Sequence, residues 1–392
     1  MTPAARIAAA IEVLDTIASG TPAEKVLTTW ARKNRYAGAK DRAALRDLVF
    51  EALRNRASFA HLGGGTGGRA LMLGLLRSAG TDPAEHFTGQ GYAPAPLSSE
   101  EGAFQPGPAD LATRLDCPSW LLDEMQQSLG NDLEPVLGLL KSRAPVFVRV
   151  NSQKATRDSA IEALAADGIM AQPHPLAETA LELVENPRRL RNSVAFRNGL
   201  VELQDAASQA VSALVGAALE GATNARVLDY CAGGGGKSLA LAARDMGEIF
   251  AHDADPARMR DLPERARRAG AKVEILAHAE VAKSAPYDLV LADVPCSGSG
   301  AWRRAPAGKW DLTAKKLDEL CDIQAGILRA ISSLTAPNGQ VAYVTCSLLQ
   351  RENEAQVKAF LAEAPGWHLQ RQRRFSPLDG GDGFFVALLK GE

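Results

Sequence analysis

The stretch "LDYCAGGGGKS", residues 228–238, decides the fold, because it joins an apolar strand to a helix through a loop of four glycines. Backbone N–H groups and the helix dipole face any ligand that lies over such a loop. The phosphate-binding pattern G-x-x-x-x-G-K-[ST] would need glycine at the position of Cys231. The dinucleotide pattern G-x-G-x-x-G, begun at Gly233, would need glycine at the position of Ser238. Both patterns therefore fail by one residue.

The remaining ligand class for this loop is S-adenosylmethionine, whose amino-acid end lies over the glycines. Its ribose hydroxyls need an acid at the end of the next strand, where "IFAHD" places Asp253, with Asp255 the weaker candidate. The alternative is a glycine turn that serves only to pack the strand against the helix. The predicted cofactor contacts are Cys231, Ala232, Gly233, Gly234, Gly235, Gly236, Lys237, Asp253 and Asp293.

Strands and helices alternate outward from this loop, from residue 225 to the last helix that we predict. This alternation predicts a doubly wound, largely parallel α/β sheet that binds ligands at the carboxyl ends of its strands. Before it, apolar residues at helical spacing predict an all-α start, and "APVFVRVN" begins a compact α/β unit. We expect an all-α domain with a connector over residues 1–140, a small α/β subdomain over residues 141–200, and the catalytic domain over residues 201–392.

Composition narrows the class of protein. A chain of 392 residues with 46% hydrophobic and 23% charged side chains is expected to form two or three globular domains. No apolar run is long enough to span a bilayer, and Glu12 and Asp15 interrupt the N-terminal segment, so we predict a cytoplasmic protein without a membrane contact. The net charge is −2, yet residues 1–60 carry ten basic and six acidic side chains. This basic segment could meet phosphates or form a solvated helical face.

The five cysteines show no metal-ligand spacing, so we expect neither a metal nor a disulfide framework. Two of them each follow a predicted strand: Cys296 in "LVLADVPCSGSG" and Cys346 in "YVTCSLLQRENE". If these strands are neighbours, they lie about 4.8 Å apart, and both thiols point from the same edge over the cofactor cleft. The sequence therefore favours a paired function over two unrelated core cysteines.

Methylation at carbon 5 of a pyrimidine is a reaction that needs a thiol beside S-adenosylmethionine. A thiolate that adds to carbon 6 moves electron density onto carbon 5, which then attacks the sulfonium methyl group. An acid near the ring nitrogen stabilises the charge that develops there. Asp293 is the candidate, and the alternative is a strand-end acid that contacts only cofactor or backbone.

Together the motifs "DYCAGGGGKS", "ADVPCSGSG" and "VTCSLLQRENE" resemble those of the Sun-type RNA cytosine carbon-5 methyltransferases. The basic helical start resembles the NusB-like domain of the RsmB branch, which modifies small-subunit ribosomal RNA. The segments "FVRVNSQKATRDSAIEALAADGI" and "GLVELQDAASQAV" are similar to linking segments of that branch. The resemblance covers most of the chain, least clearly residues 61–110. It implies a class I, Rossmann-like S-adenosylmethionine-dependent methyltransferase domain, preceded by a NusB-like all-α domain and a small α/β RNA-binding subdomain.

The resemblance also implies how the residues divide the work. Cys346 is expected to be the nucleophile, Cys296 to assist the breakdown of the covalent adduct, and Asp293 to contact cofactor or base. The loop from Cys231 to Lys237 is expected to hold the cofactor. Two positions depart from the family pattern: Gly233-Gly234 replaces Ala-Pro, and "LAHAE" has His278 or Ala279 where an acid for the adenine is usual.

An unstacked cytosine in an RNA loop or bulge is the expected target, because a paired base cannot reach the cleft. In "GAWRRAPAGKWD", residues 300–311, Arg303, Arg304 and Lys309 with two tryptophans suit phosphates and bases. The alternative is a packed loop with solvated arginines. We expect a monomer that acts on 16S ribosomal RNA. The rival interpretations are the same chemistry on tRNA, a P-loop nucleotide hydrolase, and a non-catalytic RNA-binding scaffold.

Overall fold

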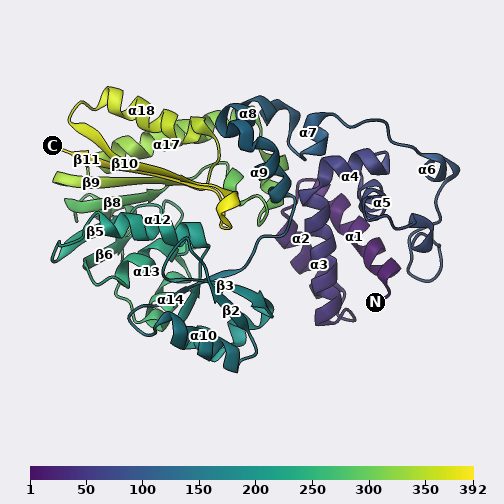
Figure 1. The fold of residues 1–392 in the computed structure, drawn as a ribbon, viewed down its shortest axis with the longest axis horizontal. Helices are drawn as coiled ribbons and strands as arrows, with labels where there is room; N and C mark the ends of the chain where they lie inside the picture. Colours follow the sequence, from purple (N-terminus) through teal and green to yellow (C-terminus); the bar gives the residue numbers. More distant parts are fainter. The chain divides into compact units, whose positions relative to one another are not determined.

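The computed structural model describes all 392 residues, and the chain divides into two compact units (Figure 1). The first unit comprises Met1–Arg143 and Trp302–Leu312, and the second comprises Ala144–Ala301 and Thr313–Glu392. Residues 302–312 therefore leave the catalytic domain, where the sequence places them, and join the helical unit. None of the helices combines the length and hydropathy that crossing a bilayer requires.

The first unit is helical, as predicted, and its apolar side chains form one continuous cluster that includes Leu14, Val49 and Met72. Phe87 belongs to this cluster, so the connector after α5 is anchored to the core. The helices are α1 (Pro3–Ala18), α2 (Ala23–Lys33), α3 (Ala39–Arg54), α4 (Arg56–Gly63), α5 (Gly68–Ser78), α6 (Ser99–Ala103), α7 (Leu111–Arg114), α8 (Leu122–Leu129), α9 (Leu133–Leu140) and, from the later segment, α16 (Pro306–Asp311).

The second unit begins with a small antiparallel sheet in the order β2-β3-β1-β4. Helices α10 (Arg157–Ala166) and α11 (Val194–Arg197) pack on it through a cluster of buried apolar residues. We did not predict the strands that begin at Met170 and Val201, because both are short and lack a clear apolar alternation. The strands are β1 (Phe147–Val150), β2 (Met170–Pro173), β3 (Ala180–Glu185) and β4 (Val201–Leu203).

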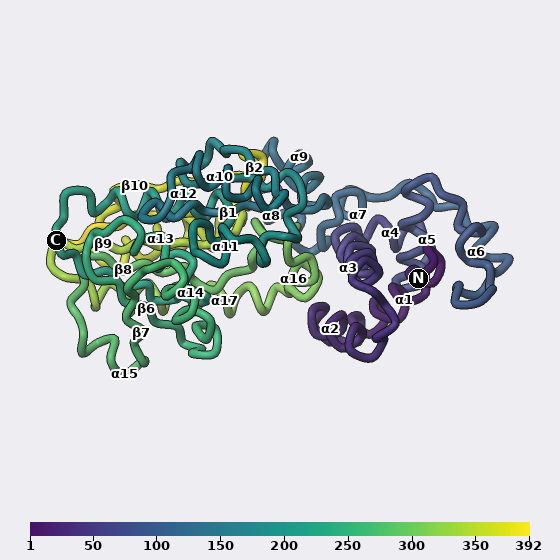
Figure 2. The backbone as a smooth tube through the Cα atoms, turned by 90° about the horizontal axis from the view of Figure 1, so that it is seen from below, coloured from purple at the N-terminus to yellow at the C-terminus, as the bar shows by residue number.

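The large sheet has seven strands in the order β10-β11-β9-β8-β5-β6-β7, and β9, β8, β6 and β7 again follow one another in the turned view of Figure 2. The five strands from β9 to β7 are parallel, which confirms the doubly wound sheet. The last two strands form an antiparallel hairpin at one edge. The bounds are β5 (Ala225–Asp229), β6 (Gly247–Ala251), β7 (Glu274–Ile275), β8 (Tyr287–Asp293), β9 (Thr335–Thr345), β10 (Trp367–Phe375) and β11 (Phe384–Gly391).

Helices cover both faces of this sheet (Figure 1). Side chains alternate between the two faces of a strand, so Leu289 and Leu291 of β8 join the cluster of α12 (Ala206–Ala217) and α13 (Gly236–Ala242). Their neighbours Val290 and Ala292 join the cluster of α17 (Ala314–Ser332) and α18 (Glu354–Glu363) on the other face. Burial on both faces explains the near-continuous apolar runs of these strands. The glycine loop and the two cysteine motifs follow directly after the carboxyl ends of these strands.

Candidate active site

The two thiols predicted to share a function lie together at the carboxyl edge of the sheet. Strands β8 and β9 are parallel neighbours, with Asp293 in register with Val344. The sulfur atoms of Cys296 and Cys346 lie 3.4 Å apart. The amide of Gly300 donates to the Cys346 carbonyl oxygen at 2.9 Å, which ties the two loops to each other. The expected neighbourhood of the two strands is confirmed.

Glycine is required in the loop after Cys296. A Cβ atom on Gly300 would lie 2.1 Å from the carbonyl oxygen of Gly383, and the amide of Gly383 donates to the Gly300 carbonyl at 2.9 Å. A side chain here would push apart the loop that follows β8, residues 295–300, which contains Pro295, Cys296 and Ser297 and is called the PCS loop below, and the residue that precedes β11. The small residues that follow Cys296 thus permit a close backbone contact.

The two thiols occupy different electrostatic surroundings. The hydrogen bond with Cys346, followed by burial, raises the pKa of Cys296 well above its usual value, and the negative charge of Glu352 adds to this shift. Lys237 is also buried, with its Nζ 2.6 Å from the Asp293 carboxylate. Burial alone would lower the pKa of Lys237, but the charge and hydrogen bond of Asp293 raise it, with a further Coulombic contribution from Cys346. Lys237 therefore stays positively charged and interacts electrostatically with Cys346, whereas the Cys296 thiol stays protonated.

The glycine loop, residues 230–235, has left-handed backbone angles at two glycines, Gly233 (φ +51°) and Gly235 (φ +78°). A Cβ atom on Gly235 would lie 2.2 Å from Leu262, so only glycine fits there. The amide of Gly233 donates to Asp253 at 2.9 Å, and Arg258 pairs with the same carboxylate at 3.2 Å. Asp253 lies at the end of β6 as predicted, and its contact with a ribose stays a prediction.

The site offers a partner for a cationic ligand group. Asp229 ends β5 and is buried, and its Oδ2 accepts from Ser238 at 2.6 Å while its Oδ1 has no partner. Burial raises the pKa of Asp229 to about 6. An unsatisfied buried acceptor is costly unless a ligand supplies a donor. Beside a glycine loop, that ligand fits the amino-acid end of S-adenosylmethionine.

Comparisons with known proteins agree with this geometry. The family described as "16S rRNA methyltransferase RsmB/F" matches residues 216–390, and the "RsmF/B-like, ferredoxin-like domain" matches residues 117–188. The ribosomal RNA small subunit methyltransferase B of Vibrio cholerae is 32% identical over 304 residues, which cover 74% of this chain and 69% of that protein. The chain belongs to this family.

The ribosomal RNA small subunit methyltransferase B of Klebsiella pneumoniae is 31% identical over 69% of this chain. The match spans 65% of that enzyme, slightly less than two thirds of its length. The crystal structure of PH0851 superposes with a TM-score of 0.79 at 24% identity and covers 99% of both chains. This likeness shows that the whole fold, the helical unit included, occurs in a solved structure.

Family membership raises the question of the adenine contact, where the chain departs from the usual acid. His278 begins α15 (His278–Val281), is exposed, and lies 3.3 Å from the buried His252, measured between ring nitrogens. His252 in turn contacts the carbonyl oxygen of Tyr230 at 2.9 Å. The two histidines thus connect the glycine loop with the segment after β7. A contact of His278 or Ala279 with adenine stays a prediction.

The structure corrects the predicted RNA contacts of Arg303 and Lys309. Both side chains are buried in the first unit, with exposed fractions of 2% and 3%. Lys309 Nζ donates to the carbonyl oxygen of Arg54 at 3.0 Å, and Arg54 Nε donates to that of Arg303 at 2.7 Å. Burial lowers the pKa of Lys309 to about 8. Arg304 is exposed, so it alone of the three stays a predicted RNA contact.

Two functional residues were missed. Arg149 lies in β1, is buried, and donates to the carbonyl oxygen of Gly236 at 2.8 Å, so the small sheet supports the end of the glycine loop. A charged residue in the apolar strand "FVRV" was the available signal, because a buried charge needs a reason. Glu352 was quoted within its motif but given no role. It joins both cysteine loops, as described below.

Proposed function

We propose that this protein transfers a methyl group from S-adenosylmethionine to carbon 5 of a cytosine in small-subunit ribosomal RNA. The observation that carries the proposal is the pair of thiols 3.4 Å apart at the strand edge that also holds Lys237 and Asp293. Membership in a family described by 16S rRNA methylation supports the substrate. With ribosomal RNA as substrate, we place the enzyme in the cytoplasm.

In the proposed mechanism, Cys346 adds as a thiolate to carbon 6 of the cytosine, which directs electron density to carbon 5. Lys237 stabilises the thiolate before attack, through the Coulombic interaction described above. Asp293 steadies the charge on the ring nitrogen or orients the cofactor. S-adenosylmethionine supplies an electrophilic methyl group when bound. Loss of the carbon 5 proton to solvent then returns its electron pair to the ring, the bond between Cys346 and carbon 6 breaks, and Cys346 leaves as a thiolate; Cys296 assists this breakdown of the adduct.

A groove of about 580 Å³ between α2 and α3 supports an RNA contact in the first unit. Arg32, Arg35 and Arg42 line it together with Trp30. Clustered arginines attract phosphates. We propose that this groove, rather than the buried side chains of Arg303 and Lys309, binds RNA in the helical unit.

Methyl transfer from labelled S-adenosylmethionine to purified 16S ribosomal RNA, small subunits and tRNA tests the proposal. Bisulfite sequencing of the product should reveal one protected cytosine in ribosomal RNA, and the Cys346→Ala variant should leave it unprotected. Methylation of tRNA alone would show that tRNA, and not ribosomal RNA, is the substrate. Binding of the cofactor without methylation of any RNA would favour a non-catalytic RNA-binding protein.

A further inference from the structure

Glu352 lies in the turn Gln350–Glu352, which follows Cys346 in the chain, and its side chain reaches the loop that contains Cys296. We propose that Glu352 is a positioning residue that joins the two cysteine loops and keeps Cys296 in the thiol form, which leaves Cys346 as the nucleophile. This inference rests on the proposed function, because it concerns how the same site divides its two roles.

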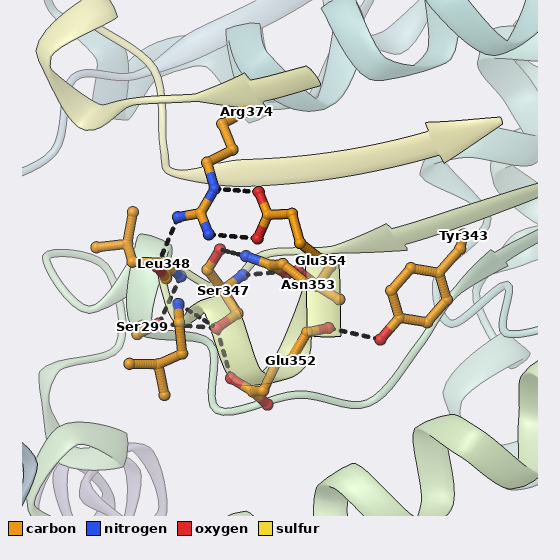
Figure 3. Close-up of polar contacts among 10 residues, drawn as sticks. Ser299, Tyr343, Ser347, Leu348, Glu352, Asn353, Glu354 and Arg374 are labelled. Atoms are coloured by element: carbon orange, nitrogen blue, oxygen red, sulfur yellow. Dashed lines mark hydrogen bonds and ion pairs between the residues drawn. The ribbon is translucent and has the colours of Figure 1, made fainter. Parts of the chain in front are cut away.

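The contacts of the carboxylate tie the two loops together, and Figure 3 shows the one with Ser347. Oε1 accepts from the Ser297 amide at 2.8 Å and from Gln324 Nε2 at 3.0 Å. Oε2 accepts from Ser297 Oγ at 2.5 Å and also from Ser347 Oγ. Ser297 follows Cys296 and Ser347 follows Cys346, so one carboxylate holds the residue after each thiol. A change in Glu352 would therefore move both sulfur atoms relative to each other.

The backbone around Glu352 is held as firmly as its side chain. Tyr343 donates its hydroxyl to the Glu352 carbonyl oxygen at 2.6 Å, and Asn353 donates its amide to the Ser347 carbonyl at 2.9 Å (Figure 3). Gln324 of α17 also donates to the carbonyl oxygen of Pro295 at 3.0 Å. A strand, a helix and the PCS loop thus converge on this residue, which places its negative charge with little freedom to move.

A purely structural role would not need a charge at this position. Glu352 is fully buried, and the four groups that donate to its carboxylate are neutral. An ionised carboxylate accepts all four, but its burial without a cation costs several kcal/mol. A glutamine of the same size could make part of the same network at lower cost. An acid at this position, together with its Coulombic contribution at Cys296, therefore points to an electrostatic use beside the thiols.

The charge acts on the two thiols unequally. Glu352 contributes to the raised pKa of Cys296, whereas Lys237 interacts with Cys346. The other titratable groups that interact with Cys296 or Glu352 are Tyr343 of β9 and Cys321 of α17. Neither of these is a cation, so neither offsets the carboxylate. The negative charge of Glu352 and the positive charge of Lys237 thus act on different thiols of the pair.

The test measures alkylation of Cys296 against pH in the full-length protein, by iodoacetamide and peptide mass spectrometry. A Cys346→Ala background removes the coupling between the thiols. Adding Glu352→Gln should move the inflection to lower pH and raise alkylation at pH 8 by about threefold or more, because the thiolate loses a like charge. Glu354→Gln is the matched control, since this carboxylate pairs with Arg374 and not with the cysteine loops (Figure 3).

Glu352→Asp in the otherwise unchanged enzyme distinguishes the effect of the negative charge from the effect of the side-chain length. It should keep the inflection of Cys296 but slow methyl transfer in a single turnover, because the shorter side chain releases one loop. An unmoved inflection in Glu352→Gln, with native circular dichroism, would overturn the inference. If that variant does not fold, Ser297→Ala should slow turnover without weakening RNA binding, and an unchanged turnover would overturn it. The alkylation uses neither RNA nor cofactor, so its failure leaves the proposed function untouched.

Discussion

The segment Trp302–Leu312 lies between β8 and β9 in the chain, yet this segment and the carboxyl edge of the two strands carry polar residues for opposite reasons. At the edge, the predicted pair of thiols assembles at 3.4 Å beside an ion pair of 2.6 Å. In the segment, two of the three predicted RNA-binding cations are buried, and one of them, Lys309, donates to a backbone carbonyl oxygen of α3. The types of residue predicted the site correctly at the ends of strands, because the sheet fixes where those residues lie. They predicted RNA contacts wrongly in the segment Trp302–Leu312, because the sequence does not show which of its side chains pack inward.

The difference is also energetic. Lys237 is buried beside a carboxylate, which keeps its pKa above the usual value. Lys309 is buried against a backbone carbonyl, and its pKa falls to about 8. A buried cation that is hydrogen-bonded to a carboxylate can serve chemistry at neutral pH, whereas one whose burial is only partly offset by a nearby acid, as Asp116 does for Lys309, weakens the fold. The two lysines therefore predict opposite outcomes of substitution.

The largest effect is expected at the edge. Cys346→Ala should lower turnover by at least about 10³-fold and abolish covalent RNA adducts, because the attacking sulfur is gone. Cys296→Ala should instead accumulate an adduct that survives denaturing gel electrophoresis. A Cys296→Ala protein that forms no adduct would reverse the roles of the two thiols.

Lys237→Gln should follow, with single-turnover methylation slowed by about 10²-fold, because the cation near Cys346 and the partner of Asp293 are both lost. The loss should be similar across pH 6–9, because its raised pKa keeps Lys237 charged throughout this range. Rapid-quench assays at several pH values would show this, and a loss confined to one end of the range would contradict it.

In the segment, Lys309→Met should raise stability rather than lower activity. The folded-state pKa of about 8 lies below the usual 10.5, so the unfolded chain binds the proton more tightly. Stability should therefore rise with pH between 8 and 10.5, and below pH 8 the buried charge costs about 3 kcal/mol. The variant should be about 1–3 kcal/mol more stable at pH 7, after loss of one hydrogen bond, with a flatter pH dependence. Denaturant unfolding at several pH values measures this, and weaker RNA binding with unchanged stability would contradict it.

The smallest effects are expected on RNA affinity. Arg42→Gln in the groove between α2 and α3 should weaken binding by about threefold to tenfold and reduce the salt slope by about one. Arg304→Gln should do less, because a single exposed arginine adds one phosphate contact at most. Filter binding at several salt concentrations compares them. A larger loss for Arg304→Gln would return the RNA contact to the segment after the PCS motif.

Much of the molecule could be predicted from local patterns. Alternating strands and helices predicted the parallel sheet, and the two cysteine motifs predicted the edge where Cys296 and Cys346 meet. The final hairpin went unpredicted because β11 is apolar on both faces and β10 is largely exposed, so neither shows a clean alternation. Arg149 and Glu352 were missed because their partners, Gly236 and Ser297, lie far away in the chain.

The sequence by itself determined the fold class, the glycine loop and the two thiols, because strand and helix periods and the ends of strands are local properties of the chain. Only the tertiary structure decided that Lys237 lies beside Asp293, that Glu352 lies between the cysteine loops, and that Lys309 is withdrawn from solvent. These outcomes depend on which distant segment covers a side chain. Burial and charge pairing are properties of the packed molecule, and they set the pKa values on which the chemistry depends.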